Sequence, residues 1–225
     1  MNQPSIFRPN YLIRRLWARG IKHWTPRYVI ARIQLELNYH RNSTDPWLTQ
    51  DAVRLLKQLL RPDDVGFEWG SGRSTIWLAE RTKQLISVEN DSKWYKSVSE
   101  TISQKELKNV QYLFHSTDQD EETGNESEYV GAIRSCADDS LDYVLVDGWG
   151  RDWCALAAIP KLKCGGMLIV DNANWYLPAP KPRAPGSQEL SPMNARWAQF
   201  LDEVSPWRPI WTTNLVTHTL ILFKK

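Results

Sequence analysis

Short apolar runs alternate with longer amphipathic stretches along this chain of 225 residues. An apolar run bounded by turn-forming residues predicts a strand, and apolar residues at helical spacing predict a helix. The pattern predicts seven strands, over residues 65–68, 85–88, 110–114, 143–146, 167–170, 210–213 and 217–223. It also predicts helices over 74–81, 92–105 and 152–161, with Ser74 as the N-cap of the first and a turn at 164–166.

The alternation of strands and helices favours a doubly wound α/β fold with a mostly parallel sheet. The last two predicted strands are an exception, because only Asn214, Leu215 and Val216 join them. A parallel crossover needs a dozen or more residues, so these two strands must form an antiparallel hairpin. The sequence therefore predicts a seven-stranded, mostly parallel sheet with an antiparallel last strand.

Closely spaced glycines follow the first predicted strand, where Glu68 precedes Gly70, Ser71 and Gly72. Glycines at such a point let the backbone turn sharply and lie against a ligand. The second strand ends in Glu89, 19 positions after Gly70, and its carboxylate can bind both hydroxyls of a ribose. This layout is typical of a nucleotide-type cofactor site, although a glycine turn in an unrelated α/β protein is an alternative.

Two departures from the dinucleotide-binding fingerprint indicate the kind of cofactor. That fingerprint has a small residue at the sixth position from the first glycine, where this chain has Thr75. Glu68 would also repel a pyrophosphate, whereas a carboxylate suits the ammonium group of an amino-acid-bearing cofactor. An acid followed by G-x-G is the first motif of the class I S-adenosylmethionine-dependent methyltransferases, and the chain resembles this family from about Asp51 to its C-terminus.

The resemblance implies a division of the chain and a set of cofactor contacts. Residues 51–225 would form the methyltransferase domain, and residues 1–50 a basic, helical N-terminal extension. Glu68 would lie near the amino-acid end of S-adenosylmethionine. Gly70, Ser71 and Gly72 would bring the backbone close to the cofactor, and Glu89 would hold the ribose hydroxyls.

Three oxygen-bearing side chains follow the fourth and fifth predicted strands: Asp147, Asp171 and Asn172. Ligand sites in such sheets lie at the carboxyl ends of the strands, so these side chains should face one cleft. Carboxylate and amide oxygens suit Mg²⁺, and the set resembles the metal triad of the catechol and caffeoyl-CoA type O-methyltransferases. The resemblance implies a Mg²⁺ that lowers the pKa of a substrate hydroxyl. A turn or cap after each strand is the alternative interpretation.

The sequence offers two candidates for the general base. The catechol-type enzymes carry a lysine base shortly after the first metal Asp, and here the corresponding stretch contains Arg151. Arginine stays protonated, so we expect Arg151 to anchor an anionic substrate rather than to accept a proton. Asp147 could act as the base if it holds no metal, and His115, after the third strand, is the second candidate.

The N-terminal extension is basic, with eight Lys and Arg up to Arg41 and one acidic residue. Tyr11, Leu12, Leu16 and Trp17 recur among these charges at roughly helical spacing. This pattern suits a helix that covers the sheet or lines the cleft, which we favour, and also an element that lies on an acidic membrane face. We expect no nucleic-acid binding, because the basic character is local and no RNA-binding module is visible.

A proline-rich stretch at about residues 175–192 begins just after the fifth strand. A loop this long in a compact domain is functional or disordered, so we interpret it as a substrate lid or recognition loop, with a disordered insertion as the alternative. Trp149, Trp153 and Trp175 lie near the two cleft-forming loops. Their rings could stack on sugar or aromatic rings, which slightly favours a glycan among small-molecule acceptors.

The predicted function is methylation of a hydroxyl oxygen of a small molecule or glycan, with S-adenosylmethionine as donor and the use of Mg²⁺ left open. The alternatives are a polyamine-synthase-like transferase, which the basic residues argue against, and a catalytically silent cofactor-binding module. The three cysteines are odd in number and lack metal-type spacing, and no run approaches the roughly 18 apolar residues of a membrane span. We therefore expect a cytoplasmic protein, at the inner membrane face if the extension contacts lipid.

Overall fold

The computed structural model describes residues 25–117 and 127–225 of the chain. In these ranges it contains a seven-stranded sheet with strand order β3-β2-β1-β4-β5-β7-β6. The strands are β1 (Val65–Trp69), β2 (Gln84–Glu89), β3 (Val110–Phe114), β4 (Leu141–Val146), β5 (Leu162–Asp171), β6 (Arg208–Thr213) and β7 (His218–Phe223). The α-helices are α2 (Pro26–Arg41), α3 (Gln50–Leu59), α4 (Arg73–Ala79), α5 (Ser92–Gln104), α6 (Glu128–Gly131), α7 (Arg151–Ala158) and α8 (Ala195–Glu203).

The pairing of the strands confirms the predicted fold class. Strands β1 to β5 all run parallel to one another, whereas β7 runs antiparallel to both β5 and β6. The last strand lies between β5 and the edge strand β6, and its antiparallel pairing with β6 is what the short link between the two predicted strands requires. Because Asp171 pairs with Thr219, the turn between β6 and β7 lies at the same edge of the sheet as the carboxyl end of β5.

Two local predictions are wrong. Helix α4 begins at Arg73 with Gly72 as its N-cap, so Ser74 lies inside the first turn and is not the cap. Residues 164–166 do not form a separate turn before a short strand, because β5 already begins at Leu162 and runs through them. A register shift in the pairing of β4 with β5 and a φ of +79° at Gly165 accommodate this irregular stretch within the strand.

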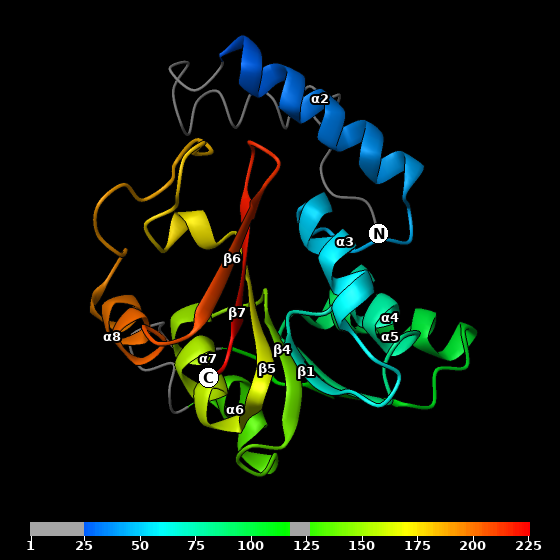
Figure 1. Ribbon diagram of the computed structural model, residues 1–225. Coiled ribbons are helices and arrows are strands. Elements are labelled where there is room, and N and C mark those ends of the chain that lie inside the picture. Colours follow the sequence, from blue (N-terminus) through cyan, green and yellow to red (C-terminus); the bar gives the residue numbers. More distant parts are fainter. Residues whose placement is uncertain (1–24, 118–126) are drawn as a thin grey trace.

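Helices cover both faces of the sheet (Figure 1). On one face, α6, α7 and α8 pack on the strands through residues such as Val144, Cys154 and Phe200. On the other face, α3 and α4 pack through a second apolar cluster that includes Tyr143 and Ile221. Neighbouring residues of one strand thus belong to opposite cores, as expected for a sheet that is buried on both sides.

Helix α2 crosses the carboxyl edge of the sheet (Figure 1). Its buried residues Ala31 and Leu35 pack against Val216, in the turn between β6 and β7. Helix α2 thus packs on the protein, whereas Tyr11 to Trp17, on which both the packed-helix interpretation and the membrane alternative rest, lie outside the described residues. Within the described part of the chain, no helix combines the length and apolar character needed to cross a membrane.

The proline-rich stretch packs on β5 and β7, because Leu177 shares an apolar cluster with Val170 of β5 and Leu220 of β7. Leu177, Ala179 and Ala184 are buried, and the backbone N–H of Gln188 donates to Asn174 O at 2.8 Å. These contacts contradict the disordered-insertion alternative. They place a structured loop directly after the carboxyl end of β5.

Candidate functional site

The glycine loop after β1 lies against the loop after β4. Gly70 has a φ of +85°, and a Cβ atom there would lie 2.7 Å from the backbone of both Asp147 and Gly148. A side chain at position 70 is therefore excluded by the backbone conformation and by the close approach of the two loops. The glycine that the sequence singled out joins the two halves of the candidate site.

Glu68 lies beneath the glycine loop. Its side chain is fully buried, and Oε2 accepts hydrogen bonds from Thr75 Oγ1 at 2.6 Å and Ser87 Oγ at 2.7 Å. Thr75 Oγ1 in turn accepts from the backbone N–H of Gly72 at 2.9 Å. A chain of hydrogen bonds thus runs from the carboxyl group to the loop backbone and fixes the position of Gly72.

Burial raises the pKa of Glu68 to about 7, although the hydroxyls of Ser74, Thr75 and Ser87 lower it in part. Its second oxygen, Oε1, is buried and has no partner at hydrogen-bonding distance among the described residues. A buried polar atom without a partner is costly. Glu68 therefore retains an acceptor for one further donor.

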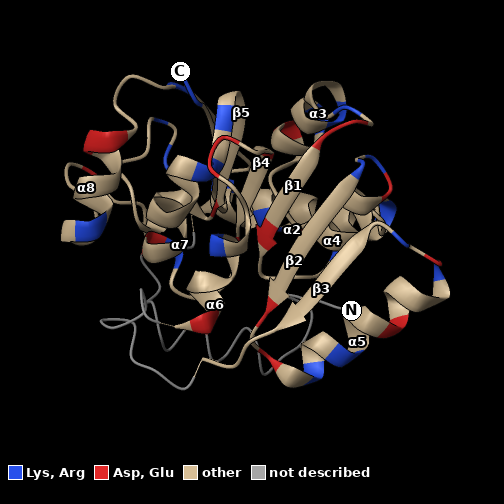
Figure 2. Cartoon of the chain, turned by 90° about the horizontal axis from the view of Figure 1, so that it is seen from below, with Lys and Arg blue, Asp and Glu red and all other residues tan. Residues whose placement is uncertain are grey.

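Glu89 organises the opposite side of the glycine loop from the carboxyl end of β2. Its Oε2 accepts from the backbone N–H of Ser71 at 3.0 Å and from Ser71 Oγ at 2.6 Å. Its Oε1 accepts from the backbone N–H groups of Asn90 and Asp91 at 2.8 and 2.9 Å. Figure 2 shows acidic positions at the carboxyl ends of both β1 and β2, where the predicted cofactor-binding acids occur.

Aromatic residues that the sequence analysis did not select surround Ser71 and Gly72. Trp94 Nε1 donates to Ser71 O at 2.6 Å, and a Cβ at Gly72 would meet the Trp94 ring at 3.6 Å. The Tyr112 hydroxyl lies 2.6 Å from Ser71 Oγ, and Trp47 lies against Trp94 with a centroid distance of 6.0 Å. These residues come from β3, α5 and the segment before α3, and no local motif links them.

The structure brings Asp147, Asp171 and Asn172 together around a fourth residue, Arg151. Its Nη2 donates to Asp147 Oδ1 at 2.8 Å and to Asp147 O at 2.9 Å. Its Nη1 donates to Asp171 O at 2.6 Å and to Asn172 Oδ1 at 3.4 Å, while Nε donates to Gly148 O at 3.0 Å. The expectation that Arg151 anchors an anionic substrate is therefore wrong, because its donors bind the protein itself.

The two carboxyl groups of this cluster differ in exposure. The side chain of Asp147 remains 31% exposed, whereas Asp171 is buried and its Oδ1 accepts from Thr219 Oγ1 at 3.0 Å. Burial and the nearby Asp147 raise the pKa of Asp171 to about 7. Asp147 is thus the carboxylate of this pair that can reach a bound molecule.

The cluster does not fit a divalent metal in the observed arrangement. Arg151 is already hydrogen-bonded to Asp147 Oδ1 and Asn172 Oδ1, which belong to two of the three predicted ligand side chains. A metal ion there would face a fixed positive charge and would have to displace the guanidinium.

His115 lies apart from this cluster. It follows β3, where its Nδ1 is 3.2 Å from Glu128 Oε2. The strand order places β2 and β1 between β3 and β4, and three strand spacings of about 4.8 Å correspond to roughly 14 Å. The structure therefore does not bring the two base candidates, His115 and Asp147, together.

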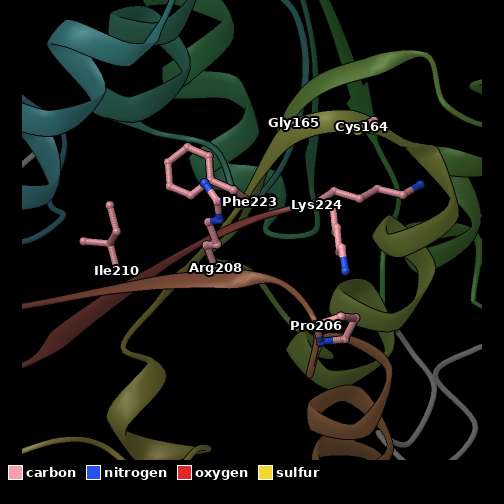
Figure 3. A pocket seen from close by; sticks show the side chains of 8 residues that line it. Cys164, Gly165, Pro206, Arg208, Ile210, Phe223 and Lys224 are labelled. Atoms are coloured by element: carbon pink, nitrogen blue, oxygen red, sulfur yellow. The ribbon is translucent and has the colours of Figure 1, made fainter.

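A cavity of about 780 Å³ lies at the opposite edge of the sheet (Figure 3). Its lining includes Gly165, near the beginning of β5, and Arg208, the first residue of β6. The glycine loop lies at the carboxyl ends of the parallel strands. This cavity is therefore separate from the candidate cofactor site.

All three cleft tryptophans have ring contacts within the protein, and Trp175 packs edge-on against Tyr176 with a centroid distance of 6.5 Å. Trp149 packs edge-on against Tyr129 with a centroid distance of 6.2 Å, and the Arg196 guanidinium covers the Trp153 ring at 4.7 Å. These contacts give Trp149 and Trp153 a packing role. They remove much of the reason for preferring a glycan on the basis of tryptophan content.

Comparison with known structures identifies the fold. A methyltransferase-like protein from Silicibacter pomeroyi is 19% identical, with 79% of this chain and 88% of that chain covered and a TM-score of 0.52. A methyltransferase from Geobacter sulfurreducens is 14% identical, with 96% of each chain covered and a TM-score of 0.51. No family model and no curated protein matches the sequence. At these identities the similarity shows that the chain has the class I methyltransferase fold.

Proposed function

We propose that this protein transfers a methyl group from S-adenosylmethionine to a hydroxyl oxygen of a small molecule or glycan. The observation that carries the proposal is the joined pair of loops at the carboxyl edge of the sheet. Gly70 brings the loop after β1 against Asp147 and Gly148, at backbone distances that exclude a side chain. Ligands of open α/β sheets bind at this edge.

The residues around the loops fit the proposed cofactor. Glu89 would accept hydrogen bonds from the ribose hydroxyls. These would either add to or replace the hydrogen bond that Glu89 accepts from the Ser71 hydroxyl. The free oxygen of Glu68 offers an acceptor beneath the loop, and the backbone at Gly72 is open apart from Trp94. When bound, S-adenosylmethionine supplies an activated methyl group, and the protein contributes binding and orientation.

Asp147 is the residue we assign to the acceptor hydroxyl. It lies beside the glycine loop, its side chain is partly exposed, and Arg151 fixes one of its oxygens. A carboxylate in this position can accept a hydrogen bond from the hydroxyl and take its proton as the methyl group is transferred. His115 is not assigned a role in this step.

Calorimetric titration with S-adenosylhomocysteine tests the cofactor assignment. We expect Glu89→Ala to weaken binding by at least about tenfold, because a charge-assisted hydrogen bond contributes roughly 1.5–3 kcal/mol. Glu100→Ala is the matched control, since Glu100 is an exposed glutamate on α5. We expect it to leave the affinity unchanged.

An affinity that Glu89→Ala leaves unchanged would contradict the ribose assignment, and a wild-type chain that binds no cofactor would defeat the whole proposal. An acceptor screen for methyl transfer follows the titration. Binding without transfer to any hydroxyl compound would favour the silent cofactor-binding module. Transfer of an aminopropyl group from decarboxylated S-adenosylmethionine would favour the polyamine-synthase alternative.

A further inference from the structure

Arg151 makes an unusually complete set of hydrogen bonds. A guanidinium carries five N–H donors, and five hydrogen bonds lead from Arg151 to acceptors on two neighbouring strand ends. The arginine is the first residue of α7, and Gly150 before it has a left-handed conformation with a φ of +57°. This turn starts the helix so that the arginine side chain reaches back to the sheet.

The acceptors include the oxygens that a metal would use. Asp147 Oδ1 and Asn172 Oδ1 both accept from Arg151, at 2.8 and 3.4 Å. The carbonyl of Asp171 accepts at 2.6 Å, so the backbone at the end of β5 is tied to the same group. One permanent cation thus joins the ends of β4 and β5.

The charges in the cluster also indicate that Arg151 supplies the cation at this place. Asp147 and Asp171 place two carboxyl groups close together, and the side chain of Arg151, with 13% exposure, lies beside them. The face of the Tyr176 ring lies 5.7 Å from the guanidinium carbon and adds a further favourable contact for a cation. A second cation at this place would be repelled across a short, poorly hydrated distance.

We infer that Arg151 is a built-in replacement for the divalent cation: it occupies the cation position between Asp147 and Asn172, and this chain works at that site without a metal. Arg151 is a positioning residue, because it orients Asp147 and does not itself reach the acceptor. For catalysis the inference rests on the proposed function. For the proposed methyl transfer, the inference implies that an acceptor needs only one hydroxyl, because no metal is present to bind a second, neighbouring oxygen.

The inference also predicts a gain of function. Removal of the guanidinium leaves two carboxyl groups and an amide oxygen around a vacated cation position, and such hard oxygen ligands suit Mn²⁺ and Mg²⁺. We therefore expect Arg151→Met, which keeps an unbranched apolar side chain, to bind Mn²⁺ at least tenfold more tightly than the wild type does. The variant should unfold at a lower temperature than the wild type. Addition of Mn²⁺ should restore part of this difference in unfolding temperature, because a bound ligand stabilises the folded state.

The experiment is a Mn²⁺ titration by calorimetry, together with thermal unfolding in Mn²⁺ and in EDTA. Arg196→Met is the matched control. Like Arg151, Arg196 pairs with a carboxylate, that of Asp152 on α7 at 2.7 Å, and its guanidinium covers an aromatic ring. It should destabilise the chain without creating Mn²⁺ binding. Adding Asp147→Asn to Arg151→Met should abolish the gained binding.

Two results would overturn the inference. One is saturable Mn²⁺ binding by the wild type that Asp147→Asn removes, and the other is a folded Arg151→Met variant with no gain in Mn²⁺ affinity. If that variant does not fold, the wild-type titration still decides. None of these measurements depends on methyl transfer, and a separate S-adenosylhomocysteine titration shows whether the proposed function fails.

Discussion

At the residue scale, the two glycines of the motif have different physical roles. Gly70 is held at a φ of +85°, and a Cβ added there would lie 2.7 Å from backbone atoms, whereas a Cβ at Gly72 would meet the Trp94 ring at 3.6 Å, an ordinary contact. We expect Gly70→Ala to lower the free energy of unfolding by about 2 kcal/mol or more. Gly72→Ala should change it by less than about 1 kcal/mol. Urea unfolding measures both, and equal losses would contradict the distinction.

Glu68 is expected to make the stability depend on pH. Its pKa rises from 4.5 to about 7 on folding because of burial, so the folded state holds the proton more tightly than the unfolded state. The resulting stabilisation is complete below about pH 4.5 and is lost as the pH rises to about 7.

In Glu68→Gln the difference in unfolding free energy between pH 5 and pH 8 should shrink by about 2 kcal/mol. The measurement is urea unfolding of both chains at the two pH values. Asp171, whose pKa is also raised to about 7, keeps its own contribution in both chains and so does not affect the comparison. Identical pH profiles would show that Glu68 does not change its protonation on folding.

At the element scale, α2 is attached to the sheet through a small apolar contact. Leu35 is 4% exposed and packs toward Val216, while Leu37 on the same helix is 46% exposed. We expect Leu35→Ala to weaken the docking of α2 by about 2 kcal/mol, because buried apolar contacts are lost. Leu37→Ala should have little effect.

Hydrogen exchange measures this difference element by element. In Leu35→Ala the amides of α2 should exchange faster, whereas those of β4 should keep their protection. Uniformly faster exchange across both elements would mean that α2 is part of the central cooperative unit. Either result bears on whether this helix can open over the carboxyl edge of the sheet.

At the scale of the whole molecule, β7 ties the parallel part of the sheet to its edge strand. Ile221 is fully buried and pairs with Ile169 of β5 and Ile210 of β6. We expect Ile221→Ala to lower the free energy of unfolding by about 3 kcal/mol through lost burial and a cavity. The exposed Ile30, at 56%, provides the control, and Ile30→Ala should cost less than about 0.5 kcal/mol.

Unfolding followed by circular dichroism and by tryptophan fluorescence tests whether this loss is global. We expect both signals to shift together in Ile221→Ala, because its neighbours belong to a core that spans the sheet. Two separate transitions would instead indicate that the β6–β7 hairpin unfolds independently of the parallel strands.

The sequence by itself determined the strands, their parallel and antiparallel arrangement, and the motif acids. Periodicity and link length are local properties, so the short connection between the last two predicted strands was sufficient to require a hairpin. The spacing from Gly70 to Glu89 likewise follows from one strand–helix–strand unit, and the structure places both residues around Ser71.

The tertiary structure alone decided how the side chains at the strand ends are used. Asp147 and Asp171 suggested a metal in the sequence because their oxygens suit one, but Arg151 returns from the start of α7 and binds the same strand ends. Tyr112 meets Ser71 from a strand 41 positions away in sequence. Such partners are set by chain folding over long distances, and no residue spacing encodes which charge will occupy the space between two strands.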